Sequence, residues 1–134
     1  MRLVVDTNIL IAALVRDSAT RNLLTHLDAE LFLISFSYEE IEKHQDELLQ
    51  KAHISEASFK AMLEQLTSKC VILDDKLLIS HWEAAKKIMW KIDPNDMPFI
   101  AAALAIGADI WSEDIHFTKQ SVIRVWSTSE LLRK

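Results

Sequence analysis

Short apolar runs alternate along the chain with longer segments of helical periodicity. Compact apolar runs bounded by polar residues are typical of buried strands. Five such runs predict strands at residues 3–5, 31–35, 70–73, 110–112 and 122–126.

The segments between these runs place apolar residues three or four positions apart, which is the spacing of an amphipathic helix. They predict helices at residues 7–14, 18–27, 37–51, 55–69, 76–92, 99–106 and 127–132. Ser37 is the expected N-terminal cap of the third helix. The clearest turn is residues 93–96, where Pro94 fixes a backbone dihedral and its Asp and Asn neighbours tolerate tight geometry. The helix that follows is apolar on all sides, which predicts burial on more than one face, and Gly107 is its expected stop.

Strands separated by helices favour parallel pairing through right-handed crossovers. We therefore predict an α/β fold, a three-layer α/β/α sandwich with a central parallel sheet of four to five strands. At 134 residues we expect a single domain covering residues 1–134. In such sheets ligands bind outside the carboxyl ends of the strands.

Composition narrows the possible functions. The chain has one Gly, which excludes both glycine-rich phosphate-binding loops, so no nucleotide cofactor is expected. The lone Cys70 falls in a predicted strand and is interpreted as a small buried hydrophobe rather than a nucleophile. With no N-terminal signal pattern, a reducing cytoplasm is the expected location. The longest apolar stretch, residues 98–107, is about half of the roughly 20 residues that span a bilayer, so no membrane segment is expected.

The net charge of −5 does not favour binding of nucleic acid, but the charges are unevenly distributed along the chain. Residues 1–75 hold 7 basic and 13 acidic side chains, whereas residues 76–134 hold 8 basic and 7 acidic ones. A bound cation would offset part of the negative balance. The basic side chains are then either a solvated face or a basic rim around a site, with Lys86, Lys87, Lys91, Lys119 and Arg124 as its candidates.

Four acidic residues fall where a predicted strand ends or a predicted helix begins: Asp6, Glu40, Asp96 and Asp114. Each has a structural alternative. Asp6 and Asp96 could cap helices, and Glu40 could form a capping box with Ser37. On the third helix, Ile41 marks the buried face, so Glu39 points to solvent and Glu40 lies nearest the strand ends.

Carboxylates that converge on one sheet edge are difficult to keep ionised. Two of them about 5 Å apart repel by roughly 3 kcal/mol at an effective dielectric near 20. A cation removes this cost, and all-oxygen ligation with several waters favours Mg²⁺ or Mn²⁺. The five histidines lack the close ligand spacing of a zinc site. His44 and His116 lie near the acids in sequence. Either could support the metal ligands from behind, but a surface or packed position is the expectation for both.

Together these residues resemble the PIN-domain family of small metal-dependent nucleases. The resemblance covers essentially the whole chain. It is carried by four segments in family order: Val-Val-Asp-Thr-Asn at residues 4–8, residues 37–42 of the third helix, Asp-Pro-Asn-Asp-Met-Pro-Phe-Ile-Ala at residues 93–101, and Trp-Ser-Glu-Asp-Ile-His-Phe at residues 111–117.

The resemblance implies that the four acids form a metal-binding and catalytic cluster. It makes Asp93 an auxiliary acid, with Ser112 or Asn8 supporting metal-bound water. It implies hydrolysis of RNA phosphodiesters by metal-activated water, on single-stranded or looped RNA, with 5′ phosphate and 3′ hydroxyl products. Small stand-alone members resemble the VapC toxins, ribonucleases held inactive by a partner antitoxin and often homodimeric.

Two other functions use similar residues. A PIN-fold nucleic-acid-binding or scaffold module would bind without turnover, although a purely structural site has no need of four acids. A response-regulator receiver would need a phosphoacceptor Asp at a mid-chain strand end. Asp74 and Asp75 offer acids there, but the residues around them resemble a helix start.

Overall fold

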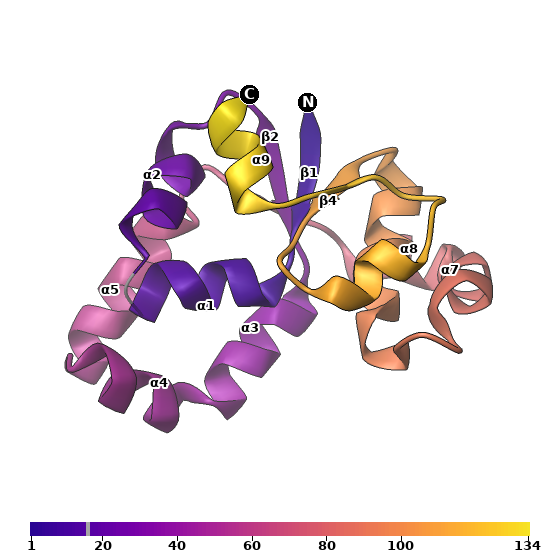
Figure 1. Ribbon diagram of the computed structural model, residues 1–134. Helices are drawn as coiled ribbons and strands as arrows, with labels where there is room; N and C mark the ends of the chain where they lie inside the picture. The colour runs from indigo at the N-terminus through magenta and orange to yellow at the C-terminus, as the bar shows by residue number, and fades with distance from the viewer. Residues whose placement is uncertain (16) are drawn as a thin grey trace.

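The computed structural model describes residues 1–15 and 17–134, and a parallel sheet lies at the centre of the described chain (Figure 1). Its five strands follow the order β3-β2-β1-β4-β5, and every neighbouring pair is parallel, as the sequence predicted. The strands are β1 (Arg2–Val5), β2 (Glu30–Leu33), β3 (Val71–Ile72), β4 (Asp109–Trp111) and β5 (Val125–Trp126).

Side chains of β1 alternate between two hydrophobic cores, one on each face of the sheet. Leu3 and Val5 lie in the first core and Val4 in the second, and all three are fully buried. Successive strand residues point to opposite faces, so a strand without polar positions must be covered on both sides. The sheet is therefore the middle layer of the predicted α/β/α sandwich.

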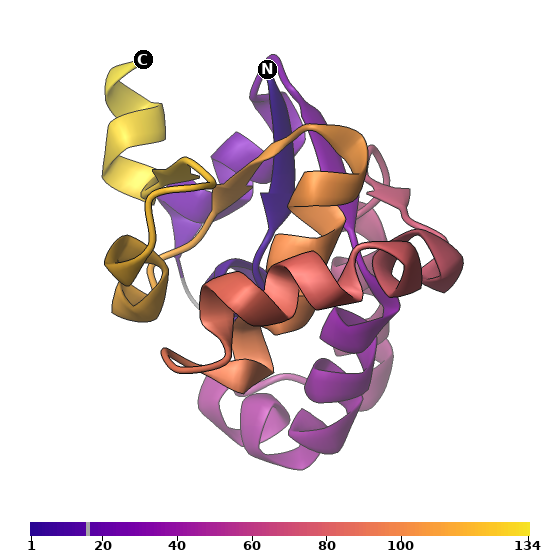
Figure 2. The same ribbon diagram turned by 90° about the vertical axis from the view of Figure 1, so that its right-hand side faces the viewer.

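Helices from different parts of the chain cover the two faces. The first core includes residues of α1 (Thr7–Val15), α2 (Ser18–His26), α3 (Ser35–Lys43), α4 (Gln45–Ala52), α5 (Glu56–Leu66) and α9 (Thr128–Arg133). The second includes residues of α6 (Asp75–Ser80), α7 (Trp82–Met89), α8 (Met97–Ile106) and the 3-10 turn η2 (Ile115–Lys119). Figure 2 shows α7 and α8 in front of the sheet.

Two predicted helices are each broken into two at a histidine. The segment predicted as one helix over residues 37–51 is α3 and α4, which meet at His44 (φ −105°, ψ 14°). Residues 76–92 give α6 and α7, which meet at His81 (φ −112°, ψ 10°). Each histidine ends one helix and begins the next. Because apolar residues keep helical spacing through both breaks, the sequence pattern did not predict them.

Several predicted ends were also wrong. Strand β2 ends at Leu33 and α3 begins at Ser35 after Ile34, so Ser37 lies inside the helix and does not cap it. The strand predicted over residues 122–126 is limited to Val125 and Trp126. The preceding residues are held in a turn by the side chain of Gln120, which accepts hydrogen bonds from the backbone N–H groups of residues 122 and 123.

Strand β3 is similarly shorter than predicted and leaves Cys70 just outside it. Cys70 is half-buried against the first core, and burial raises the pKa of its thiol to about 11. A thiol that resists ionisation is a poor nucleophile. This agrees with the packing role that the sequence predicted.

Helix α8 is buried in the second core, as its all-apolar sequence predicted. Residues 99–103 are buried, and Gly107 ends the helix in the left-handed conformation (φ 63°). Despite its apolarity α8 is only ten residues long. In the described part of the chain, no helix combines the length and apolarity needed to cross a membrane.

Candidate metal centre

Asp6 is the first residue after β1 and is held by the neighbouring strand. Its backbone N–H donates to the carbonyl of Trp111 at 3.0 Å, and its Oδ2 accepts a 2.6 Å hydrogen bond from the hydroxyl of Ser112. Only 5% of Asp6 is exposed. The pairing of β1 with β4 therefore fixes this carboxylate at the carboxyl edge of the sheet.

The surroundings of Asp6 disfavour its charged form. Burial is the main reason that its pKa rises to about 6, and the nearby charges of Asp114 and Glu40 raise it further. The hydrogen bond from Ser112 acts in the opposite direction. Asp6 is thus a carboxylate with little water and several negative neighbours.

Glu40 is held by the hydroxyl group of Thr7, which in turn lies beside the hydroxyl group of Ser37. The Oγ1 of Thr7 lies 2.6 Å from Glu40 Oε1 and 2.9 Å from the Oγ of Ser37. A carboxylate only accepts, so the single proton of Thr7 goes to Glu40 while the Ser37 hydroxyl can donate to Thr7. Glu39 is exposed, as predicted. Glu40 takes no part in the capping box considered above, because Ser37 is already the third residue of α3.

The turn before α8 carries two acids with different surroundings. Asp93 Oδ1 accepts a 3.0 Å hydrogen bond from the backbone N–H of Asn95, which is the expected turn-forming role. Asp96 occupies the N-cap position of α8, but its side chain makes no capping hydrogen bond. Asp96 is 7% exposed, and its buried Oδ2 has no hydrogen-bond partner among the described residues.

Burial and repulsion both act on Asp96. Its pKa rises to about 8, first because of burial and then because of the charges of Asp114, Asp6 and Asp93. Because its side chain makes no capping hydrogen bond, Asp96 does not fit the simple N-cap alternative. A buried acceptor without a donor indicates that another group completes this site.

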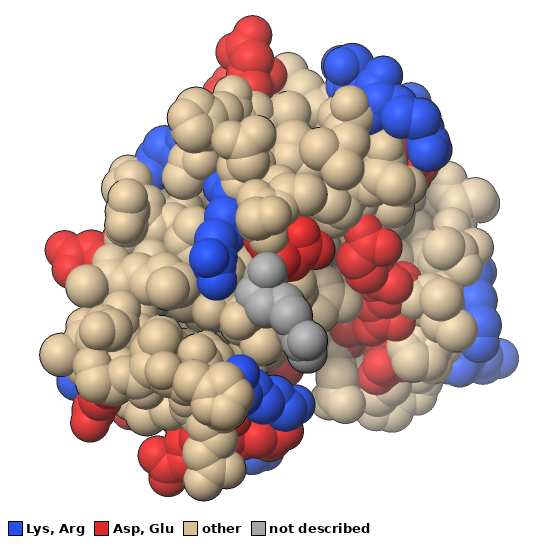
Figure 3. All heavy atoms as spheres, turned by 60° about the vertical axis from the view of Figure 1, so that its left-hand side comes forward, with Lys and Arg blue, Asp and Glu red and all other residues tan. Residues whose placement is uncertain are grey.

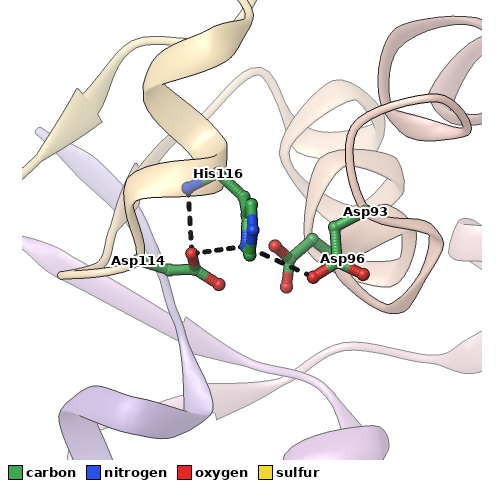
Figure 4. A group of neighbouring side chains, drawn as sticks. All are labelled: Asp93, Asp96, Asp114 and His116. Atoms are coloured by element: carbon green, nitrogen blue, oxygen red, sulfur yellow. Dashed lines mark hydrogen bonds and ion pairs between the residues drawn. The ribbon is translucent and has the colours of Figure 1, made fainter.

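Asp114 and His116 complete the group from the loop after β4. Asp114 Oδ1 accepts a 2.9 Å hydrogen bond from the backbone N–H of His116, and the Asp114 N–H donates to Ser112 Oγ at 2.9 Å. The Nδ1 of His116 lies 2.9 Å from Asp114 Oδ1 and 3.4 Å from Asp93 Oδ2 (Figure 4). The sequence favoured a surface or packed position for His116 over a role beside the metal ligands, whereas the structure places its ring among the acids. The Asp-x-His spacing, which lets the Asp side chain bond the His backbone, was the available signal.

The closest group comprises Asp93, Asp96, Asp114 and His116, whose potential ligand atoms lie within 4.8 Å of one another. Carboxylates at this separation repel by about 3 kcal/mol per pair at an effective dielectric near 20. Figure 3 shows one face of the molecule on which acidic side chains gather in a band, with basic side chains scattered around it. Carboxylate oxygens are the donors that Mg²⁺ and Mn²⁺ prefer, so the three carboxylates of this group, with Asp96 Oδ2 lacking a partner among the described residues, fit a hard divalent cation.

The remaining predicted residues lie at different distances from this group. Asp6 and Glu40 fall outside the closest group, although Asp6 interacts electrostatically with Asp96 and Asp114. Ser112 bridges Asp6 and the backbone of Asp114. Asn8 is exposed on α1, and in the described part of the chain no hydrogen bond joins it to the acids.

Comparison with known proteins gives a family and a fold. A family model for the PIN domain matches residues 4–134. The structure of VapBC2 from Rickettsia felis, bound to a DNA fragment from their promoter, is similar with a TM-score of 0.72 at 16% identity, covering 95% of this chain and 98% of that chain. The structure of VapBC-1 from nontypeable Haemophilus influenzae is similar with a TM-score of 0.65 at 18% identity, covering 96% of this chain and 99% of that chain. No curated protein matches the sequence. At these identities the two structures show a likeness of fold.

The raised pKa values predict how stability depends on pH in the absence of metal. Asp6 and Asp96 bind protons more tightly in the native chain than in the unfolded chain, so the stability they contribute is present at low pH. It is lost as pH rises from about 4 to 8. In EDTA, Asp96→Asn should therefore raise the free energy of unfolding at pH 8 by about 2 kcal/mol and change it little at pH 4.

Urea unfolding of the wild type and the variant at both pH values measures this difference directly. Glu39→Gln is the matched control, because it removes one carboxylate from an exposed position of α3. Equal effects of Asp96→Asn at pH 4 and pH 8, or a loss of stability at pH 8, would contradict the assignment of Asp96 as a buried, repelled acid.

Proposed function

The chain belongs to the PIN-domain family, and from this premise we propose that it is a ribonuclease that depends on Mg²⁺ or Mn²⁺. The observation that carries the proposal is the orphaned Oδ2 of Asp96, buried among acids whose repulsion a cation would remove. Asp6, Glu40, Asp96 and Asp114 are the proposed metal-binding and catalytic residues. Asp93, Ser112 and His116 are the proposed auxiliary residues.

The arrangement of hydrogen bonds supports this assignment. Asp6, Glu40 and Asp114 each have one carboxylate oxygen held by a donor, from Ser112, Thr7 and the backbone of His116 respectively. For Glu40 and Asp114, no donor among the described residues holds the other oxygen, whereas the backbone N–H of Thr7 also hydrogen-bonds the carboxylate of Asp6. Fixing one oxygen orients the carboxylate and leaves the second for a cation, which is how outer-shell partners orient metal ligands.

The proposed chemistry is hydrolysis of an RNA phosphodiester by activated water. A divalent cation held by these acids would polarise the phosphoryl oxygen, lower the pKa of the attacking water and stabilise the leaving 3′ oxygen. The chain's own groups would orient the reactants and move protons. The Nδ1 of His116, beside Asp114, is placed to hold or release one proton as negative charge develops nearby.

Single-stranded or looped RNA is the proposed substrate. A chemistry that acts at the phosphodiester needs an exposed backbone, which unpaired strands provide. The acids lie at the carboxyl edge of the sheet, which is where parallel sheets bind ligands. An open edge can accept a passing strand.

We further propose an antitoxin partner and a homodimeric, cytoplasmic toxin. The support is the likeness of fold to two proteins whose structures are named as VapBC pairs. An inhibitor of such an enzyme would have to cover or disorder the acidic edge of the sheet.

The nuclease proposal predicts metal-dependent cleavage of a labelled single-stranded RNA. Cleavage should require Mn²⁺ or Mg²⁺ and stop in EDTA, because the acids need a bound cation to polarise the phosphoryl oxygen and activate the attacking water. Asp6→Asn and Asp96→Asn should each slow cleavage by at least about 100-fold, the upper range for disturbing a metal's supporting residues. Glu39→Gln should cleave at the wild-type rate.

Purification of all variants in parallel controls for contaminating ribonuclease. Activity that survives EDTA, or that persists in both Asp→Asn variants, would contradict the metal mechanism. Metal binding without turnover by the wild type would instead favour the scaffold function.

The toxin proposal predicts that induced expression arrests the growth of a bacterial host. Arrest should occur with the wild type and Glu39→Gln but not with Asp96→Asn, because arrest would require RNA cleavage. The reading frame upstream of the gene should encode a small protein whose co-expression restores growth. Normal growth during accumulation of an active wild-type enzyme would separate a housekeeping nuclease from a toxin.

A further inference from the structure

A tryptophan and three lysines form an exposed patch at the end of α7. The α7 patch consists of Lys86, Lys87, Trp90 and Lys91. Lys86 and Lys87 lie in the last turn of α7, and Trp90 and Lys91 directly follow it. All four are exposed, whereas Ala85 and Met89 of the same helix are fully buried in the second core. They line most of a groove of about 530 Å³, together with Glu83 and Ile88.

Trp90 is unusually exposed for its type. Its relative exposure is 57%, although burying an aromatic ring of this size would be strongly favourable. The ammonium group of Lys86 lies 5.3 Å from the centre of the ring, in the range of a cation–π contact. This contact orients the ring while leaving more than half of the residue open to solvent.

The charge of the patch identifies the kind of partner. In the part of the chain that the structure describes, none of its three ammonium groups forms an ion pair, and Glu83 is the one acid among the groove's lining residues. An aromatic ring surrounded by unneutralised lysines matches a nucleotide strand, which offers a base to the ring and phosphates to the ammonium groups. The patch is therefore a locally basic area on a protein whose net charge is −5.

The patch is joined rigidly to the acidic cluster. Trp90 precedes Asp93 by three residues, so their Cα atoms are at most about 11 Å apart. The carbonyl of Met89 accepts hydrogen bonds from the N–H groups of Ile92 at 3.0 Å and Asp93 at 2.9 Å. Because Met89 is itself fully buried, this turn holds the backbone of Trp90 at a short distance from the backbone of Asp93.

We infer that the α7 patch is a stacking platform for single-stranded RNA, which holds a base on Trp90 and leads the adjoining backbone to the acidic cluster. The inference rests on the proposed ribonuclease function for its choice of RNA. It adds a substrate-positioning residue, Trp90, that does not touch the reacting phosphate. Bases of any kind stack on aromatic rings, so the platform should favour single-stranded over paired RNA without favouring a particular base sequence.

The test is binding of a fluorescein-labelled single-stranded RNA to the full chain in EDTA, measured by anisotropy without cleavage. Trp90→Ala should weaken binding by about tenfold, equivalent to about 1.4 kcal/mol, whereas Trp90→Phe should keep most of the affinity. The matched control is Trp82→Ala, which removes a partly exposed tryptophan (38%) from the other end of α7. It should bind as the wild type does.

A fluorescence measurement separates stacking from a change in folding. RNA should quench the tryptophan emission of the wild type, and this quenching should be largely lost in Trp90→Phe, which still binds. Unchanged affinity in Trp90→Ala, or an equal loss in Trp82→Ala, would overturn the inference and favour a protein partner for the patch.

The two proposals can fail separately. If the wild type cleaves RNA and Trp90→Ala binds and cleaves RNA as the wild type does, the platform inference is wrong and the nuclease function stands. If binding depends on Trp90 but no metal supports cleavage, the platform stands and the nuclease function is wrong.

Discussion

Repulsion between carboxylates that the fold brings together is the constraint on which the rest of the site depends. Asp6 and Asp96 are buried at the carboxyl edge of the sheet, where little water screens their charge. The pKa of both is raised, to about 6 and about 8. A protein keeps such a costly arrangement when another group relieves it, and an oxygen-rich donor set points to a hard cation.

Among the described residues, the acids are held by hydroxyl groups and backbone N–H groups, and no lysine or arginine forms an ion pair with them. Ser112 donates to Asp6, Thr7 lies against Glu40, and the backbone of His116 donates to Asp114. Neutral donors orient carboxylates without occupying the space between them, whereas a basic side chain would replace the cation. The same strands provide both sets of groups, because pairing of β1 with β4 places Asp6 beside Ser112.

Sequence patterns predicted the parallel sheet and most of its covering helices, because these follow from local rules. Strand β1 ends where its apolar run ends, and Gly107 stops α8. The breaks at His44 and His81 were missed because helical spacing continues across them. The place of His116 among the acids depends on the path of η2, which no periodicity specifies. Likewise the capping alternative for Asp96 could be tested only by finding its carboxylate without a capping bond.

Mn²⁺ binding to the full chain, measured by isothermal titration calorimetry at pH 8, tests the central claim that the gathered acids form a cation site. The account predicts saturable binding that Asp96→Asn weakens by at least about tenfold, while Glu39→Gln leaves it unchanged. Loss of Asp96 removes both a ligand and much of the local negative charge, so its effect should exceed that of any exposed acid. Absence of binding by the wild type, or equal affinity in Asp96→Asn, would contradict the account.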